Sequence, residues 1–199
     1  IHDLLGKLEH FKALGTLAGQ SYEERVKKFE ERAGRQLLVA LHEATLGRPF
    51  EEIIINEFQN ITPKEAQSIY LSICVLARLN CNVRAGIISR IHGVPFTDFQ
   101  KRFFEPLEYI VHANFNKIIR DYEYSARHPD IAEIVFQNIL TNPDERYNVY
   151  ITCLQALNID YTSDRHAFRH MVGGKNLLEL FPNHEMVVNI YRLVLEMVG

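Results

Sequence analysis

The stretch YIVHANFNKIIRDYEYSARHPDIAEIVFQNIL, residues 109–140, changes its periodicity twice. Residues 109–111 and 122–126 are of β type, and the polar residues 114–121 between them suit a connection between two strands. From Pro129 to Leu140 the pattern is helical, and proline suits the first position of a helix. The stretch therefore predicts a β-hairpin that is followed directly by a helix.

Three helices are predicted before this hairpin, over residues 63–79, 83–91 and 98–107. The clearest start is Thr62-Pro63-Lys64-Glu65, in which Thr suits the N-cap, Pro suits the first helical position and Glu reaches back to the cap. Gly93 ends the second helix, and Thr97 with Gln100 caps the third. Three helices and then a hairpin is the order of a winged-helix unit, which we assign to residues 61–140. The hairpin is the only β element that we expect.

Residues 1–60 are predicted to form a helical segment that precedes the winged helix. Ser21 with Glu24 three residues later is a capping box, which marks the start of a charged helix. Ile53-Ile54-Ile55 would also suit a short strand on propensity alone. The expected helices cover residues 1–14, 22–33, 35–45 and 51–60.

Residues 141–199 are predicted to form a helical segment that resembles paired repeats. Short loops separate apolar-periodic stretches, and no internal sequence repeat supports a defined repeat family. The expected helices cover residues 144–158, 163–172, 176–180 and 185–198. The fold class that we predict is therefore mainly α, with a helical lid-like segment, a winged-helix unit and a C-terminal helical segment.

Composition limits the class of protein. The chain has 199 residues, of which 47% are hydrophobic and 24% charged, so a disordered or low-complexity protein is excluded. The net charge of −3 does not favour nonspecific nucleic-acid binding. No run reaches the roughly 18 apolar residues that a membrane helix needs. The chain starts at Ile1 and stops at Gly199 directly after an apolar helical run, so we expect it to be part of a longer polypeptide.

The three cysteines, Cys74, Cys81 and Cys153, are too few and too scattered for a disulfide framework. We expect reduced, buried thiols and a cytoplasmic location. His166 and His170 stand four residues apart, a spacing that can hold zinc, but a third ligand is missing and two ordinary surface histidines are favoured. No metal site is therefore predicted.

Catalytic motifs are absent from the sequence. It contains no Walker A loop, no glycine-rich dinucleotide fingerprint and no nucleophile elbow. We therefore predict no self-contained catalytic centre in this chain, and any enzymatic activity would belong to another part of the parent polypeptide.

A basic face could indicate DNA binding by the winged helix. The presumed recognition helix carries three isoleucines and few polar residues, which is a thin surface for reading bases. We therefore expect DNA to be an unlikely partner, and a solvated basic face is favoured. The residues considered for phosphate contacts are Arg78, Arg84, Arg90, Lys101 and Arg102.

His128 stands where the second strand turns into a helix, and Pro129 places it at or beside the N-cap. Unpaired backbone N–H groups and the positive end of the helix dipole make such a position suitable for an anion, and Arg127 adjoins it. The alternative is a capping histidine that is satisfied by its own backbone. Spacing alone leaves both interpretations open.

The residues 124–133, YSARHPDIAE, resemble the strand–His–helix element of the winged-helix domain in STAND NTPases, which are signal-transducing ATPases. Residues 34–45 with 47–50, together with Val83-Arg84-Ala85-Gly86 and Phe104-Glu105-Pro106-Leu107, resemble bacterial members that carry sirtuin-like or TIR effector domains. Tyr161-Thr162-Ser163-Asp164-Arg165 resembles the link into a helical repeat sensor.

The family resemblance implies a role for the turn before the last winged-helix helix. It aligns Arg127 with the Met and His128 with the His of the family's Met-His-Asp motif, and Asp130 stands one position late, behind Pro129. In the family this His contacts the β-phosphate of bound ADP and holds the off state. The nucleotide-contact residues implied here are thus His128 and Arg127, completed by a P-loop domain in cis.

The resemblance implies a noncatalytic regulatory fragment that closes over ADP or ATP and couples ligand sensing to effector activation. A protein trigger, homo-oligomerisation on activation and bacterial antiphage defence are implied in the same way. Two alternatives stay open: a winged-helix DNA-binding regulator, and a helical scaffold that binds protein through residues 141–199.

Overall fold

The computed structural model describes residues 1–31, 47, 49–95, 98 and 103–198. Within these ranges the chain is mainly helical with a small antiparallel sheet, which confirms the predicted fold class. It divides into two compact units, Ile1–Asn56 and Glu57–Gly199. The assignment of lid-like, winged-helix and repeat-like segments stays a prediction. The helix expected over residues 35–45 and the cap expected from Thr97 and Gln100 lie outside the described residues.

The first unit contains a pair of helices, α1 (His2–His10) and α2 (Tyr22–Glu31), with a 3₁₀ turn, η1 (Gly15–Leu17), between them. The helix predicted over residues 1–14 ends at His10, because Lys12 has a left-handed backbone with φ of 54° that turns the chain. The apolar residues of the predicted helix are therefore divided: Leu5 lies in α1, and Leu14 is the N-cap of η1. Among the described residues of this helix pair, Leu5, Leu14 and Leu17 form a buried apolar cluster.

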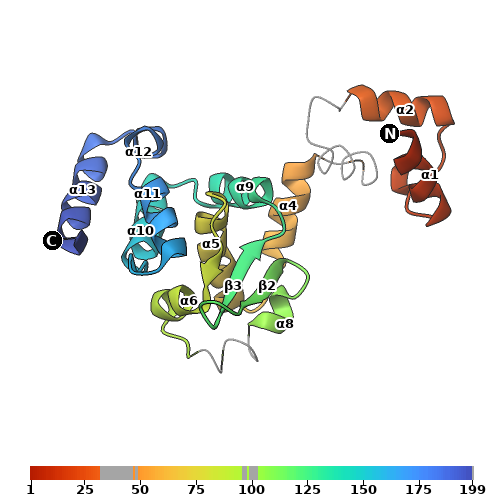
Figure 1. Ribbon diagram of the computed structural model, residues 1–199. Helices are drawn as coiled ribbons and strands as arrows, with labels where there is room; N and C mark the ends of the chain where they lie inside the picture. Colours follow the sequence, from red (N-terminus) through yellow and green to blue (C-terminus); the bar gives the residue numbers. More distant parts are fainter. Residues whose placement is uncertain (32–46, 48, 96–97, 99–102, 199) are drawn as a thin grey trace. The chain divides into compact units, whose positions relative to one another are not determined.

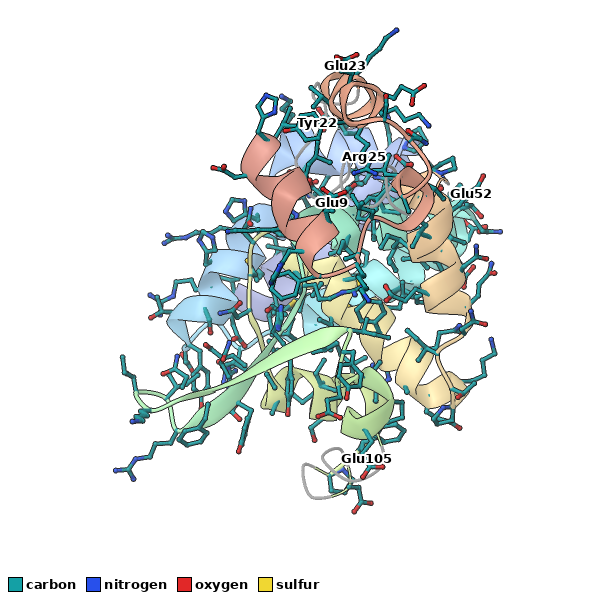
Figure 2. The ribbon with its side chains drawn as sticks, turned by 90° about the vertical axis from the view of Figure 1, so that its right-hand side faces the viewer. Glu9, Tyr22, Glu23, Arg25, Glu52 and Glu105 are labelled. Atoms are coloured by element: carbon teal, nitrogen blue, oxygen red, sulfur yellow. The ribbon has the colours of Figure 1, made fainter. Side chains whose placement is uncertain are left out.

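Polar contacts fix the end of the connection into α2. The backbone N–H of Ser21 donates to Glu24 at 2.8 Å and that of Glu24 donates to the Ser21 hydroxyl at 3.3 Å, which confirms the predicted capping box. Arg25 is buried and donates to the backbone oxygen of Leu17 at 3.0 Å and to Glu9 at 3.1 Å. Figure 2 labels Arg25 and Glu9, which face each other between α2 and α1.

Helix α4 (Phe50–Gln59) contains Ile53-Ile54-Ile55, so the strand considered for these residues is wrong. The second unit begins near the end of α4, at Glu57. The next helix, α5 (Lys64–Ala77), has Pro63 as its N-cap, and the predicted capping role of Thr62 is wrong. The physical reason is that Pro63 has an extended backbone, with ψ of 174°, and so flanks the helix instead of opening it.

The small sheet contains β1 (Val83–Arg84), β2 (Val111–Asn116) and β3 (Asp121–Ala126) in the order β1-β3-β2. Val83 pairs with Tyr124 and Arg84 with Glu123, both antiparallel. The prediction of a hairpin as the only β element is therefore wrong, and so is the helical assignment of residues 83 and 84. A two-residue strand has no periodicity of its own, and its partner lies about 40 residues away in the chain.

The first strand of the hairpin, β2, extends further towards the turn than the sequence indicates. Tyr109 and Ile110 precede β2, while residues 114–116, which were assigned to the turn, continue the strand and pair with Asp121–Glu123. Asn116 accepts from the backbone N–H of Ile118 at 3.0 Å, and this side-chain bond starts the turn.

Helices that come before and after the hairpin in the sequence pack against its strands. Helix α5 contacts β3 and α9 (Pro129–Ile139), and α6 (Ala85–His92) also contacts β3. Figure 1 shows the β2–β3 hairpin with α5 behind it and α9 at the end where β3 leaves the sheet. The short helix α8 (Phe104–Leu107) lies before β2. Helix α5 is the centre of the unit, because nearly all residues of its second half are buried.

Four helices complete the second unit: α10 (Pro143–Gln155), α11 (Thr162–Met171), α12 (Gly174–Leu180) and α13 (His184–Val198). Asn142 caps α10 and accepts from the backbone of Asp144 at 2.8 Å. Helix α10 contacts α5, α6 and α13, so it connects the C-terminal helices to the sheet and its covering helices. Inside this group Tyr150 is fully buried and donates to the backbone oxygen of Met171 at 2.8 Å.

Candidate functional site at the start of α9

His128 is the N-cap of α9, and Pro129 occupies the first turn, as predicted from the sequence. The Nδ1 atom of His128 accepts a hydrogen bond from the backbone N–H of Asp130 at 3.2 Å. The alternative interpretation of a capping histidine that is satisfied by its own backbone therefore describes one nitrogen of the ring. The strand-to-helix turn itself is fixed by an extended backbone at His128, with φ of −154° and ψ of 145°.

The second ring nitrogen of His128 has a different role. Because Nδ1 accepts the capping bond, a neutral ring carries its proton on Nε2, which is then a donor. The side chain as a whole is 40% exposed. One histidine thus fixes the start of α9 with one nitrogen and offers an N–H group with the other.

The other charges at the turn reduce its attraction for an anion. Asp130, in the first turn of α9, places a carboxylate oxygen 3.7 Å from Nδ1 of His128 and so already interacts with the positive end of the helix. Arg127 forms a close ion pair with Glu57, and both side chains are 30% exposed. The guanidinium predicted to contact phosphate is therefore engaged by a carboxylate of its own unit.

A cavity of about 200 Å³ adjoins the turn through Ala126 and Pro129. It is lined by polar side chains from the loop between α5 and β1 and from β3, among them Asn80, Asn82 and Ser125. Cys81 also lines it, and burial raises the pKa of this thiol to about 11, so it is protonated at neutral pH. The cavity offers amide and hydroxyl groups and no reactive thiolate.

The arginines considered for DNA contacts do not form an open basic face among the described residues. Arg84 is buried and ion-paired with Asp164, and Arg78 donates to Glu133 at 2.8 Å. Arg90 donates to the backbone oxygen of Ala156 at 2.8 Å. Lys101 and Arg102 lie outside the described residues. Three of the five cations are thus used within the fold.

Sequence reasoning missed Asp164 and Tyr161 as partners of Arg84. The Arg84 guanidinium lies 3.5 Å from the centre of the Tyr161 ring, and its two-point ion pair with Asp164 is fully buried. In the sequence, Arg84 is a candidate for phosphate contacts, and nothing connects the segment 83–86 with the segment 161–165. A single sequence contains no signal that two stretches about 80 residues apart meet.

Other candidates for chemistry lie apart from the turn. The rings of His166 and His170 are 4.5 Å apart on α11. Within the described ranges no group of three or more His, Cys, Asp or Glu side chains is placed to hold a metal ion. The three cysteines are free and buried, as predicted.

No helix in the described part of the chain combines the length and apolar character that crossing a membrane requires. Comparisons with models of protein families, with curated proteins and with solved structures found no match. The turn at His128 is therefore interpreted from its own geometry and from the resemblance described above.

Proposed function

We propose that this chain is the regulatory part of a STAND-type nucleotide switch, in which His128 contacts a phosphate of ADP that a P-loop domain holds in cis. The observation that supports this role is the capping bond at Nδ1, which leaves Nε2 as the donor of a neutral ring in a side chain that is 40% exposed. Arg127 is assigned a positioning role through its ion pair with Glu57.

The turn offers one hydrogen-bond donor to a phosphate group. The Nε2–H of His128 donates to a phosphate oxygen, and a bond to a charged acceptor is worth about 1.5–3 kcal/mol. Bound ADP supplies the anionic acceptor. A contact that exists only in the closed form stabilises that form, so its removal raises the open population about tenfold or more.

Two substitutions separate the capping role of His128 from the phosphate contact. His128→Asn keeps a side-chain acceptor for the backbone N–H of Asp130, while its amide is too short to replace the Nε2–H of the ring. His128→Ala removes both functions. In a polypeptide that contains this chain and the P-loop domain, we expect both variants to lose co-purified ADP and to be active without ligand.

The measurement is the nucleotide released on denaturing the purified protein, together with effector activity in the absence of a trigger. Arg192→Gln on α13, far from the turn in sequence and exposed, is the control and is expected to retain ADP. Wild-type ADP content and unchanged basal activity in His128→Asn would contradict the proposed contact.

A second candidate is a helical scaffold, which is favoured by an apolar stripe on α13. Four residues at helical spacing leave apolar surface exposed: Val188, Tyr191, Leu195 and Val198. Such a stripe is typical of a helix that binds a partner. Substituting Leu195 with Glu should abolish the binding of a protein partner and leave ADP retention unchanged, which distinguishes the two functions.

A further inference from the structure

A buried ion pair joins the sheet to the C-terminal helices. Arg84 of β1 donates from Nε and from Nη2 to the two carboxylate oxygens of Asp164, each at 2.7 Å. Asp164 is the third residue of α11, and the residues are 3% and 1% exposed. Two-point pairing of this kind fixes the relative orientation of its partners as well as their distance.

Asp164 accepts two further hydrogen bonds, both from residues that lie close to it in the sequence. One oxygen accepts from the backbone N–H of Asn158 at 3.0 Å, and the other accepts from the Ser163 hydroxyl at 3.2 Å. On the opposite side, Tyr161 covers the Arg84 guanidinium. The pair is therefore shielded from water by the loop between α10 and α11.

Two further charges border the pair. Asp121, the first residue of β3, lies 3.6 Å from Arg84, and Arg90 of α6 lies 3.8 Å from Asp164. The four side chains have two positive and two negative charges, so the cluster is neutral. Burial by itself lowers the pKa of Arg84, but the hydrogen bond and charge of Asp164 outweigh it and raise that pKa. Arg84 therefore stays charged.

The location of the cluster gives it a mechanical role. Arg84 lies in the β1–β3 pairing opposite Glu123, so it belongs to the sheet. Asp164, Asn158 and Tyr161 belong to the C-terminal helices. Besides this cluster, the two parts also meet through α10, which contacts α5 and α6, and through Arg78, which donates to Asn176 of α12 at 3.5 Å. A displacement of residues 141–199 away from the sheet must therefore separate Arg84 from Asp164.

We propose that Arg84 and Asp164 form a releasable latch, which holds residues 141–199 on the edge of the sheet and lets them detach while α5 and α9 stay folded. Once separated, both charges are hydrated, which limits the free-energy cost of the released state. A half-broken latch is unfavourable, because one buried charge then lacks its partner. The latch is thus closed or open, which suits a two-state transition. This inference does not depend on the nucleotide contact proposed above.

Hydrogen exchange of the 199-residue chain tests the latch. The variants are Arg84→Met, Asp164→Asn and the double variant, in which no charge is left unpaired at these two positions and Asn still accepts from the backbone of Asn158. Each single variant is expected to exchange the amides of residues 143–198 about a hundredfold faster or more, because an unpaired buried charge is strongly unfavourable. The amides of α5 and α9 are expected to keep their wild-type rates.

The double variant is expected to return to within about tenfold of the wild-type rates, because no uncompensated charge is left at the pair. Asp160→Asn, an exposed acid in the same loop, is the matched control. Where Arg84→Met does not fold, Arg84→Lys replaces it, since it keeps the charge and loses the two-point geometry. Equal acceleration in α5, α9 and residues 143–198, no acceleration in the single variants, or no recovery in the double variant would each overturn the latch.

Discussion

The starts of α9 and α11 each carry a side chain that bonds backbone at a helix start, but the two sites use that side chain differently. At α9, His128 forms one capping bond through Nδ1, and its side chain is 40% exposed. At α11, Asp164 is almost completely buried and accepts bonds from Arg84, Asn158 and Ser163. Both sites follow short loops or bends that the sequence predicts.

The difference indicates where a ligand could bind and where the fold is held together. A group with unused donors at the surface can exchange water for a ligand at little cost. A buried charge whose bonds are all formed inside the protein has nothing to offer a ligand, and its loss weakens the packing around it. We therefore assign binding to His128 and mechanical coupling to Asp164. Four predictions test this contrast.

The largest effect is expected from Asp164→Ala, which leaves the buried Arg84 without its main partner. Breaking a buried pair on one side costs about 3–5 kcal/mol, and we expect this loss in the free energy of unfolding. Urea titration followed by far-ultraviolet circular dichroism measures it. Asp160→Ala, at an exposed position, should stay within about 0.5 kcal/mol of the wild type. A loss under 1 kcal/mol for Asp164→Ala would remove the contrast between the two sites.

An intermediate loss of stability is expected from Arg78→Met, because only one member of the Arg78–Glu133 ion pair is buried. The Arg78 side chain is 6% exposed and that of Glu133 is 40% exposed, so Glu133 can be hydrated when Arg78 is removed. The guanidinium also lies 4.1 Å from the centre of the Phe136 ring. We expect a loss of about 1.5–3 kcal/mol in the same urea experiment. Lys175→Met, which removes an exposed pair with Glu179, should change stability by less than about 0.5 kcal/mol.

A pH effect is expected from His92, a partly buried histidine at the end of α6. Burial lowers its pKa below the ordinary 6.5, and its ring lies 3.0 Å from the Ser72 hydroxyl. As the pH falls below 6.5, the unfolded chain binds a proton that folded His92 resists, so stability decreases. One proton contributes at most about 1.4 kcal/mol per pH unit.

The measurement for His92 is the free energy of unfolding at pH 7.5 and at pH 5.5, in the wild type and in His92→Gln. The variant should lose less stability over this interval, since it has no proton to gain. His112→Gln, at an exposed position of β2, is the control and should follow the wild type. An equal loss in His92→Gln would show that His92 is not the source of the pH dependence.

The smallest effect is expected from His128→Ala in this chain, where only the cap of α9 is lost. Removing a capping side chain costs about 1 kcal/mol. His128→Asn retains an acceptor and should be close to the wild type in a urea titration. A loss of 3 kcal/mol or more in His128→Ala would place His128 with Asp164 as a structural residue, and the contrast would not hold.

Local signals predicted most of the helical elements correctly. The capping box at Ser21, the N-cap at His128 and the helix that Pro129 opens all depend on neighbours within three residues, so a single sequence contains the information. The errors occur where pairing with residues far away in the sequence sets the secondary structure. Val83 and Arg84 are extended because they pair with β3, and residues 114–116 are extended because they pair with the return strand.

The same division between local signals and distant partners applies to the candidate site. Its position at a strand-to-helix turn could be predicted, and so could the capping role of His128. The engagement of Arg127 by Glu57 could not, because these residues are 70 positions apart. For the same reason the sequence does not reveal that Arg84 and Arg78, two candidates for phosphate contacts, are paired within the fold with Asp164 and Glu133.

The helical class, the hairpin followed by a helix, and the imidazole at the start of α9 can all be predicted from the amino-acid sequence. These features depend on local backbone preferences and on apolar spacing within one element. The pairing of the charged side chains, in contrast, is set by the folded arrangement of distant segments. This pairing depends on burial and on partners from distant segments, and a charge is stable in the protein interior only where such a partner meets it.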